Sequence, residues 1–162
     1  MLAREKKSKK PLGASSASRW PREPVFFLDK CLGNYDVAEA LRATGLSVEL
    51  HRDHFDPDSP DEAWLAPVGK KGWVVLTKDS RFSANYLQIA ALLHGNVRAF
   101  ALRSAELKGA SMASAFVTAL PTIFNFLNRI EAPFIARVTE HGNVKMMWHK
   151  AEIYRKFLKK AP

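Results

Sequence analysis

The sequence predicts an α/β domain in which helices cover both faces of a mostly parallel sheet. Short apolar runs alternate with helical patterns along the chain, as is typical of strands joined by crossover helices. These runs are continuously apolar, which is expected of strands buried on both faces. The 162 residues, 47% of them hydrophobic, are enough for one domain with a sizeable core. The single cysteine, Cys31, cannot form an internal disulfide, which excludes a cysteine-stapled secreted scaffold.

Six apolar runs are expected to form strands. Four of them are separated by helical patterns and should be parallel: residues 25–28, 46–50, 73–77 and 97–102. Residues 134–139 and 144–148 flank Glu140-His141-Gly142-Asn143, a turn sequence that predicts a β-hairpin.

Helices are expected between these strands and after the hairpin. The first spans residues 34–45, with Asn34 as its cap and Gly45 as its stop. A short helix through Trp64 and Leu65 should follow Ser59-Pro60-Asp61-Glu62, which has the form of an N-cap, a first-turn proline and two first-turn acids. The remaining helices are predicted at residues 83–93, at 111–130 with an interruption at Pro121, and at about 150–160.

The net charge of +9 is concentrated at the two ends of the chain. Residues 1–22 hold seven Lys or Arg and one Glu, and residues 145–162 hold six and one. We expect residues 1–22 to be a flexible basic arm and residues 149–162 to be a basic C-terminal helix. Such ends attract phosphate backbones without reading sequence; the alternative is a solvated tail and a solvated helix face.

Carboxylates follow two of the predicted parallel strands. Asp29 ends the first strand and Asp79 follows the third. The helix that begins with Asp61 and Glu62 starts at the same edge of the sheet if its crossover is right-handed. These two acids also suit a helix dipole alone. We expect Asp29, Asp79 and either Asp61 or Glu62 to converge.

Converging carboxylates repel one another and require protons or a hard cation. Oxygen ligands suit Mg²⁺ or Mn²⁺, and such a site can polarise water for attack on a phosphodiester. Asp53 is a further candidate ligand. The neighbouring Lys30, Lys78 and Arg81 would either neutralise the carboxylates or contact substrate phosphates.

Other motifs favour structural roles. The glycine patterns of dinucleotide sites and P-loops are absent. His51 and His54 lie in a predicted loop, so we expect surface or capping roles for them, and Cys31 is expected to pack as a small apolar group. One helical stripe is expected to form core or a dimer face: Phe116, Leu120, Ile123, Phe124 and Leu127.

Three segments, residues 26–33, 61–65 and 72–82, together resemble the PIN-like ribonucleases. They read FFLDKCLG, DEAWL and GWVVLTKDSRF. The bacterial branch similar to VapC-type toxins is the best match, over about residues 25–130. The resemblance implies a three-layer α/β/α PIN-like domain over residues 23–148, an endoribonuclease activity that depends on Mg²⁺ or Mn²⁺, and an antitoxin partner.

The resemblance also implies roles for single residues. Asp29 corresponds to the first metal ligand of the family, Asp61 or Glu62 to its helical acid, and Asp79 to the acid after the third strand. The fourth acid of larger PIN domains has no counterpart here, because Ser80 and Arg81 follow Asp79.

The sequence thus predicts a ribonuclease toxin in which Asp29, Asp79 and Asp61 or Glu62 hold one divalent ion. The missing fourth acid motivates an alternative, a degenerate PIN-like domain that binds RNA or protein without cleavage. No window approaches 18 uninterrupted apolar residues, so we expect a soluble cytoplasmic protein, with a homodimer as one option.

Overall fold

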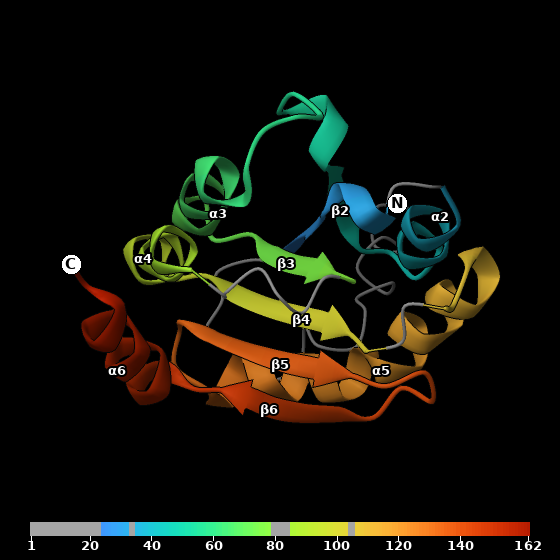
Figure 1. Ribbon diagram of the computed structural model, residues 1–162. Coiled ribbons are helices and arrows are strands. Elements are labelled where there is room, and N and C mark those ends of the chain that lie inside the picture. Colours follow the sequence, from blue (N-terminus) through green and yellow to red (C-terminus); the bar gives the residue numbers. More distant parts are fainter. Residues whose placement is uncertain (1–23, 33–34, 79–84, 104–105) are drawn as a thin grey trace, which may run out of the picture.

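A six-stranded sheet forms the centre of the computed structural model (Figure 1). The structure describes residues 24–32, 35–78, 85–103 and 106–162. The strands, in the order in which they lie side by side, are β2 (Ser47–Leu50), β1 (Val25–Leu28), β3 (Val74–Thr77), β4 (Arg98–Leu102), β5 (Phe134–Val138) and β6 (Val144–Trp148). All neighbouring pairs are parallel except β5 with β6, which are antiparallel. The mostly parallel sheet and the C-terminal hairpin are confirmed.

Helices cover both faces of this sheet, so the three-layer architecture is also confirmed. One core lies under α2 (Tyr35–Ala43) and α5 (Gly109–Arg129), and a second lies under α3 (Asp61–Lys70), α4 (Tyr86–Gly95) and α6 (Lys150–Lys160). Figure 1 shows α3, α4 and α6 together on one side of the strands, with α2 and α5 on the other. Short 3-10 helices follow β1 (Lys30–Leu32) and β2 (His51–Asp53).

Two helices contain an internal proline, and at one of these, Pro121, the sequence suggested a break. The helix α3 runs to Lys70 through Pro67, and its N-cap is Pro60 and not Ser59. The helix α5 is continuous through Pro121, which is exposed. A proline inside a helix removes one backbone hydrogen bond. In both helices this loss is offset because residues on either side of the proline bury apolar side chains against the sheet.

The apolar stripe of α5 belongs to the core of the domain. By length and composition α5 is the one helix of the described residues that could cross a membrane. Its stripe instead packs against the sheet, with Phe116, Leu120, Ile123 and Leu127 buried and Phe124 edge-on to the ring of Phe26. The core interpretation of this stripe is therefore confirmed.

The helices α3 and α4 pack closely along their length. A Cβ atom on Gly69 would lie 2.3 Å from the carbonyl oxygen of Gly95, so the C-terminal ends of the two helices touch backbone to backbone. At their N-terminal ends, the Gln88 side chain donates a hydrogen bond of 3.1 Å to Oδ2 of Asp61. Both helices lie between successive parallel strands, so their N-termini share the edge where those strands end.

Candidate active site

The carboxyl ends of β1 and β3 form the switch point of the sheet. From β1 the chain crosses to β2 on one side, and from β3 it crosses to β4 on the other. In open α/β sheets a ligand crevice lies outside this point. The backbone N–H of Asp29, directly after β1, donates to the carbonyl of Leu76 in β3 at 3.0 Å, so Asp29 sits at the switch point.

The carboxylate of Asp29 is held from one side. The side chain is 5% exposed. Its Oδ2 accepts a hydrogen bond of 2.7 Å from the Thr77 hydroxyl and a longer contact of 3.5 Å from the Cys31 thiol. Its Oδ1 is buried and has no hydrogen-bond partner among the described residues. Leaving a buried carboxylate oxygen unsatisfied is costly, so Oδ1 is the atom at this site that requires a ligand.

Cys31 packs against the core under α2 and α5, as expected, and it also belongs to this polar network. Its Sγ lies 3.3 Å from the Thr77 hydroxyl and accepts a hydrogen bond of 3.1 Å from the backbone N–H of Lys78. Burial, and then the charge of Asp29, raise the pKa of the Cys31 thiol to about 11. Cys31 is therefore a thiol at neutral pH that can donate to Asp29, and it is not a nucleophile.

Asp61 and Glu62, the acids in the first turn of α3, lie at the same edge of the sheet, in the helix layer that α3 shares with α4. Asp61 is bound to Gln88, and both Asp61 and Glu62 are half-buried. No group of three His, Cys, Asp or Glu side chains able to hold a metal is found within the described part of the chain. Asp79 lies outside the described residues, so the convergence of three carboxylates stays a prediction.

The basic residues predicted near the carboxylates make other contacts. The Lys30 ammonium donates to the carbonyl of Pro57, in the loop before α3. Lys78 takes part in the network through its backbone N–H. Arg81 lies outside the described residues. The phosphate-binding role of Lys30, Lys78 and Arg81 stays a prediction, and Asp53 is exposed in the turn after β2.

His51 is buried beside this site, so the expected surface or capping role is wrong for it. The register of β1 and β2 aligns Leu28 with Leu50, so Asp29 and His51 leave the two strands at the same level. The His51 ring is 1% exposed, packs against aromatic rings that include Trp64, and has neither nitrogen bonded among the described residues. Burial lowers the pKa of His51; Asp29 opposes this effect, and Lys30 adds to it. His51 is therefore neutral at pH 7.

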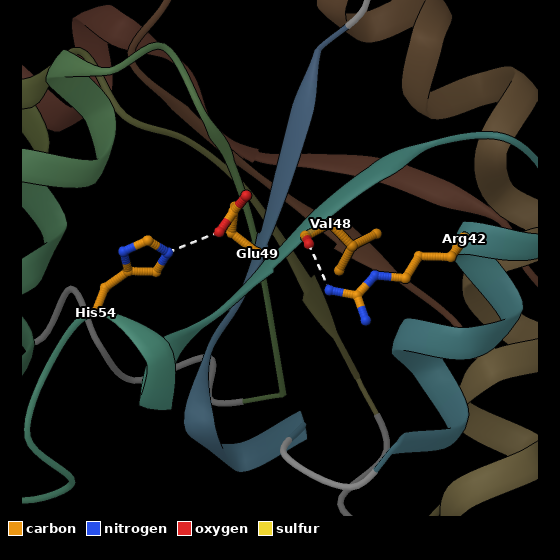
Figure 2. A network of polar contacts seen from close by, with 4 residues as sticks. All are labelled: Arg42, Val48, Glu49 and His54. Carbon is orange, nitrogen blue, oxygen red and sulfur yellow. Dashed lines mark hydrogen bonds and ion pairs between the residues drawn. The ribbon is translucent and has the colours of Figure 1, made fainter.

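His54 pairs with Glu49, as Figure 2 shows, at 2.7 Å and near the surface. On the other side of β2, Arg42 of α2 donates a hydrogen bond of 2.7 Å to the carbonyl of Val48. These contacts anchor an edge strand and the turn that follows it. Because His51 packs among rings while His54 binds Glu49, the two histidines do not form a metal pair.

The part of the chain that holds this site matches a known family. The sequence model of a family described as "PIN like domain" matches residues 24–104, half of the chain, from β1 to the end of β4. The chain belongs to the PIN-like domain family. A Mycobacterium tuberculosis protein named "Putative ribonuclease VapC45" is 26% identical over 125 residues, which cover 75% of this chain and 90% of that protein. No solved structure matches significantly.

In this PIN-like domain, the structure defines the contacts of Asp29 more fully than those of the other predicted site residues. Sequence reasoning missed the contribution of Thr77 to the site and the polar contacts of Cys31, and it placed His51 at the surface, where the structure buries it. Thr77 offered a signal, because it is a hydroxyl side chain at the end of an otherwise apolar strand. Nothing near Cys31 in the sequence showed that it meets Thr77, which lies 46 positions further on.

Proposed function

We propose that this PIN-like domain is a metal-dependent endoribonuclease and the toxin of a toxin–antitoxin pair. The observation that carries the proposal is the buried carboxylate of Asp29 at the switch point, with Oδ2 satisfied and Oδ1 free among the described residues. The name of the Mycobacterium tuberculosis relative supports the same class of reaction.

The donor atoms fit a hard divalent cation. The orphaned Oδ1 is an anionic oxygen, and Mg²⁺ and Mn²⁺ prefer oxygen ligands. The proposed ligands are Asp29, Asp79 and either Asp61 or Glu62. When bound, such an ion supplies Lewis-acid polarisation of a phosphoryl oxygen and of water.

The side chains around Asp29 orient its carboxylate. Thr77 and Cys31 both bind Oδ2, which fixes the rotation of the carboxylate and leaves Oδ1 for the ligand. The neutral His51 ring, buried among aromatic rings after the end of β2, adds no charge to this part of the site. Lys30, Lys78 and Arg81 would contact the phosphates that flank the cleaved bond.

The partners and the location follow from the proposed class. The substrate is RNA, and an antitoxin would bind and inhibit the domain in the cytoplasm. A homodimer is compatible with this assignment but is not required by it.

The test is cleavage of end-labelled single-stranded RNA in the presence of Mn²⁺. Asp29→Asn keeps the shape of the side chain and removes the anionic ligand, so we expect the rate to fall by at least about 100-fold. Glu39→Gln, at an exposed position of α2, is the matched control and should cleave like the wild type.

Each contrary result has its own meaning. Cleavage by Asp29→Asn at the wild-type rate would refute the assignment of the site. A wild-type protein that binds RNA but never cleaves it with any divalent ion would instead establish the alternative, a degenerate PIN-like binding domain.

A further inference from the structure

Three aromatic rings form a stacked ladder between α4 and α6. Tyr86, the first residue of α4, stacks on Phe157 with ring centroids 5.1 Å apart and planes 21° apart. Phe157 continues to Tyr154, with centroids 6.5 Å apart and planes 23° apart. Tyr154 is 53% exposed, so the ladder ends on a ring that is open to solvent.

The helix that carries two of the three rings, α6, is rich in cations. The helix α6 holds five Lys or Arg residues and one acid, Glu152. Arg155, Lys159 and Lys160 are exposed, while Lys156 lies over the ring of Trp148 at 4.1 Å. This charge favours a polyanionic partner. It disfavours a second copy of the chain on this face, because two such helices would repel each other.

A hollow adjoins the open end of the ladder. Its volume is about 490 Å³, and Tyr154, Leu93 and Ile130 supply apolar parts of its wall. Lys150, paired with Glu131 at 2.8 Å, also lines the hollow. The hollow is large enough for a flat heterocyclic ring that is not stacked on its neighbours, and the apolar wall of the hollow suits the face of such a ring.

The other end of the ladder lies in the first turn of α4, the turn that also contacts α3. Tyr86 lies two residues before Gln88, which binds the first-turn acid Asp61 of α3. The ladder and the first-turn acid of α3 are therefore joined through the N-terminal turn of α4.

We propose that α6 and the first turn of α4 form a binding surface for single-stranded RNA. One base stacks on Tyr154, and Arg155, Lys159 and Lys160 contact the phosphates. Aromatic stacking combined with cations that follow a backbone is the usual chemistry of sequence-tolerant binding to single strands. The surface would guide substrate to the proposed nuclease site, and in that respect the inference rests on the proposed function; the binding itself does not require cleavage.

The test measures RNA binding by the full-length chain under conditions that prevent cleavage. A fluorescent single-stranded RNA of about 12 nucleotides is titrated in EDTA and followed by anisotropy. Tyr154→Ala should weaken binding by about fivefold or more, whereas Tyr154→Phe, which keeps the ring, should stay within about twofold of the wild type. Tyr35→Ala is the matched control, because Tyr35 is 59% exposed on α2, in the opposite layer.

The salt dependence tests the cationic part of the surface. Lys159→Ala together with Lys160→Ala should reduce the slope of log K against log salt by about 0.7 for each phosphate contact that is lost. Lys70→Ala, at an exposed position in the last turn of α3, should leave the slope unchanged. The basic residues 1–22 are the same in every variant, so their contribution cancels.

Equal affinities for Tyr154→Ala and the wild type would overturn the inference. So would a dimer in sedimentation experiments that Tyr154→Ala dissociates, because that result would assign the surface to a second copy. RNA binding that depends on Tyr154 in a protein that never cleaves would support the surface and refute the proposed nuclease, so the two failures are distinguishable.

Discussion

Asp29 is a buried carboxylate with one oxygen bonded and the other without a hydrogen-bond partner among the described residues. Thr77 and Cys31 satisfy one of its oxygens, and the folded chain supplies this arrangement before any ligand arrives. Such preorganisation fixes the direction of the remaining oxygen, which in a flexible carboxylate would cost entropy on binding. At this scale, the proposed function depends on residues that touch Asp29 as much as on Asp29 itself.

His51 should make the stability of the protein dependent on pH. Burial keeps the pKa of His51 in the folded protein below its ordinary value of about 6.5, which the unfolded chain retains. Between these two values the unfolded state binds more protons, so the free energy of unfolding falls as the pH is lowered, by at most about 1.4 kcal/mol per pH unit.

His51→Phe should remove this dependence, because phenylalanine keeps a ring among the aromatic neighbours and carries no titrating group. The free energy of unfolding should be measured in urea at about pH 7.5 and about pH 5.5. Its decrease between these two pH values should be smaller for the variant than for the wild type. His141→Gln, at a position whose side chain is 80% exposed, is the control and should behave like the wild type. If the free energy of unfolding fell equally in His51→Phe and in the wild type, protonation of His51 would not destabilise the folded protein.

At the scale of elements, the close packing of α3 on α4 holds their N-termini beside the candidate site. The approach at Gly69 and Gly95 leaves no space for a side chain between the two helices. The hydrogen bond from Gln88 to Asp61 joins their other ends. The position of Asp61 thus depends on two glycines at the far ends of the helices.

Gly69→Ala should destabilise the protein even though alanine is the better helix former. Helix propensity alone favours alanine by about 1 kcal/mol. The added Cβ would lie 2.3 Å from the carbonyl oxygen of Gly95 and 2.8 Å from Cγ2 of Val97, and overpacking of this kind costs about 1–3 kcal/mol or more. We expect urea unfolding to give Gly69→Ala a lower free energy of unfolding than the wild type.

Ala63→Gly measures the propensity effect by itself, because Ala63 is exposed in the same helix. Ala63→Gly should lower the free energy of unfolding by about 1 kcal/mol, the amount expected from helix propensity. If Gly69→Ala proved more stable than the wild type, the two helices would not be in backbone contact.

At the scale of the whole molecule, charge is distributed unevenly between the body and the ends. Residues 1–22 carry a net charge of +6 and residues 145–162 carry +5, so the remaining residues 23–144 carry −2 of the total of +9. The nuclease site proposed at the switch point is acidic, so it needs a cation of its own, while the ends attract the polyanionic substrate.

A divalent ion that binds only the folded state should raise the stability of the whole domain. At a Mn²⁺ concentration about 100 times Kd, the gain is about 2.7 kcal/mol, or several degrees in Tm for a chain of this size. Asp29→Asn should lose this response, and Glu39→Gln should keep it. Differential scanning fluorimetry in EDTA and in Mn²⁺ decides the point; an equal gain in Asp29→Asn and the wild type would place the ion elsewhere.

The periodicity of apolar residues and the helix-stop residues were enough to predict the six strands and the five α-helices of the described residues, because burial on two faces and helix stops are local properties. The short 3-10 helices after β1 and β2 were not predicted. The predicted interruption at Pro121 was wrong, because the sequence alone could not weigh one lost hydrogen bond of α5 against the apolar face that α5 buries.

The sequence by itself determined the order of the elements, their layers and the edge of the sheet at which Asp29 lies. Only the tertiary structure decided which side chains meet there: Cys31 with Thr77, His51 among rings, and Tyr86 with Phe157. The physical reason is that the hydrophobic pattern of an element depends on near neighbours in the chain, whereas hydrogen bonds and ring contacts join residues tens of positions apart and exist only once the sheet has formed.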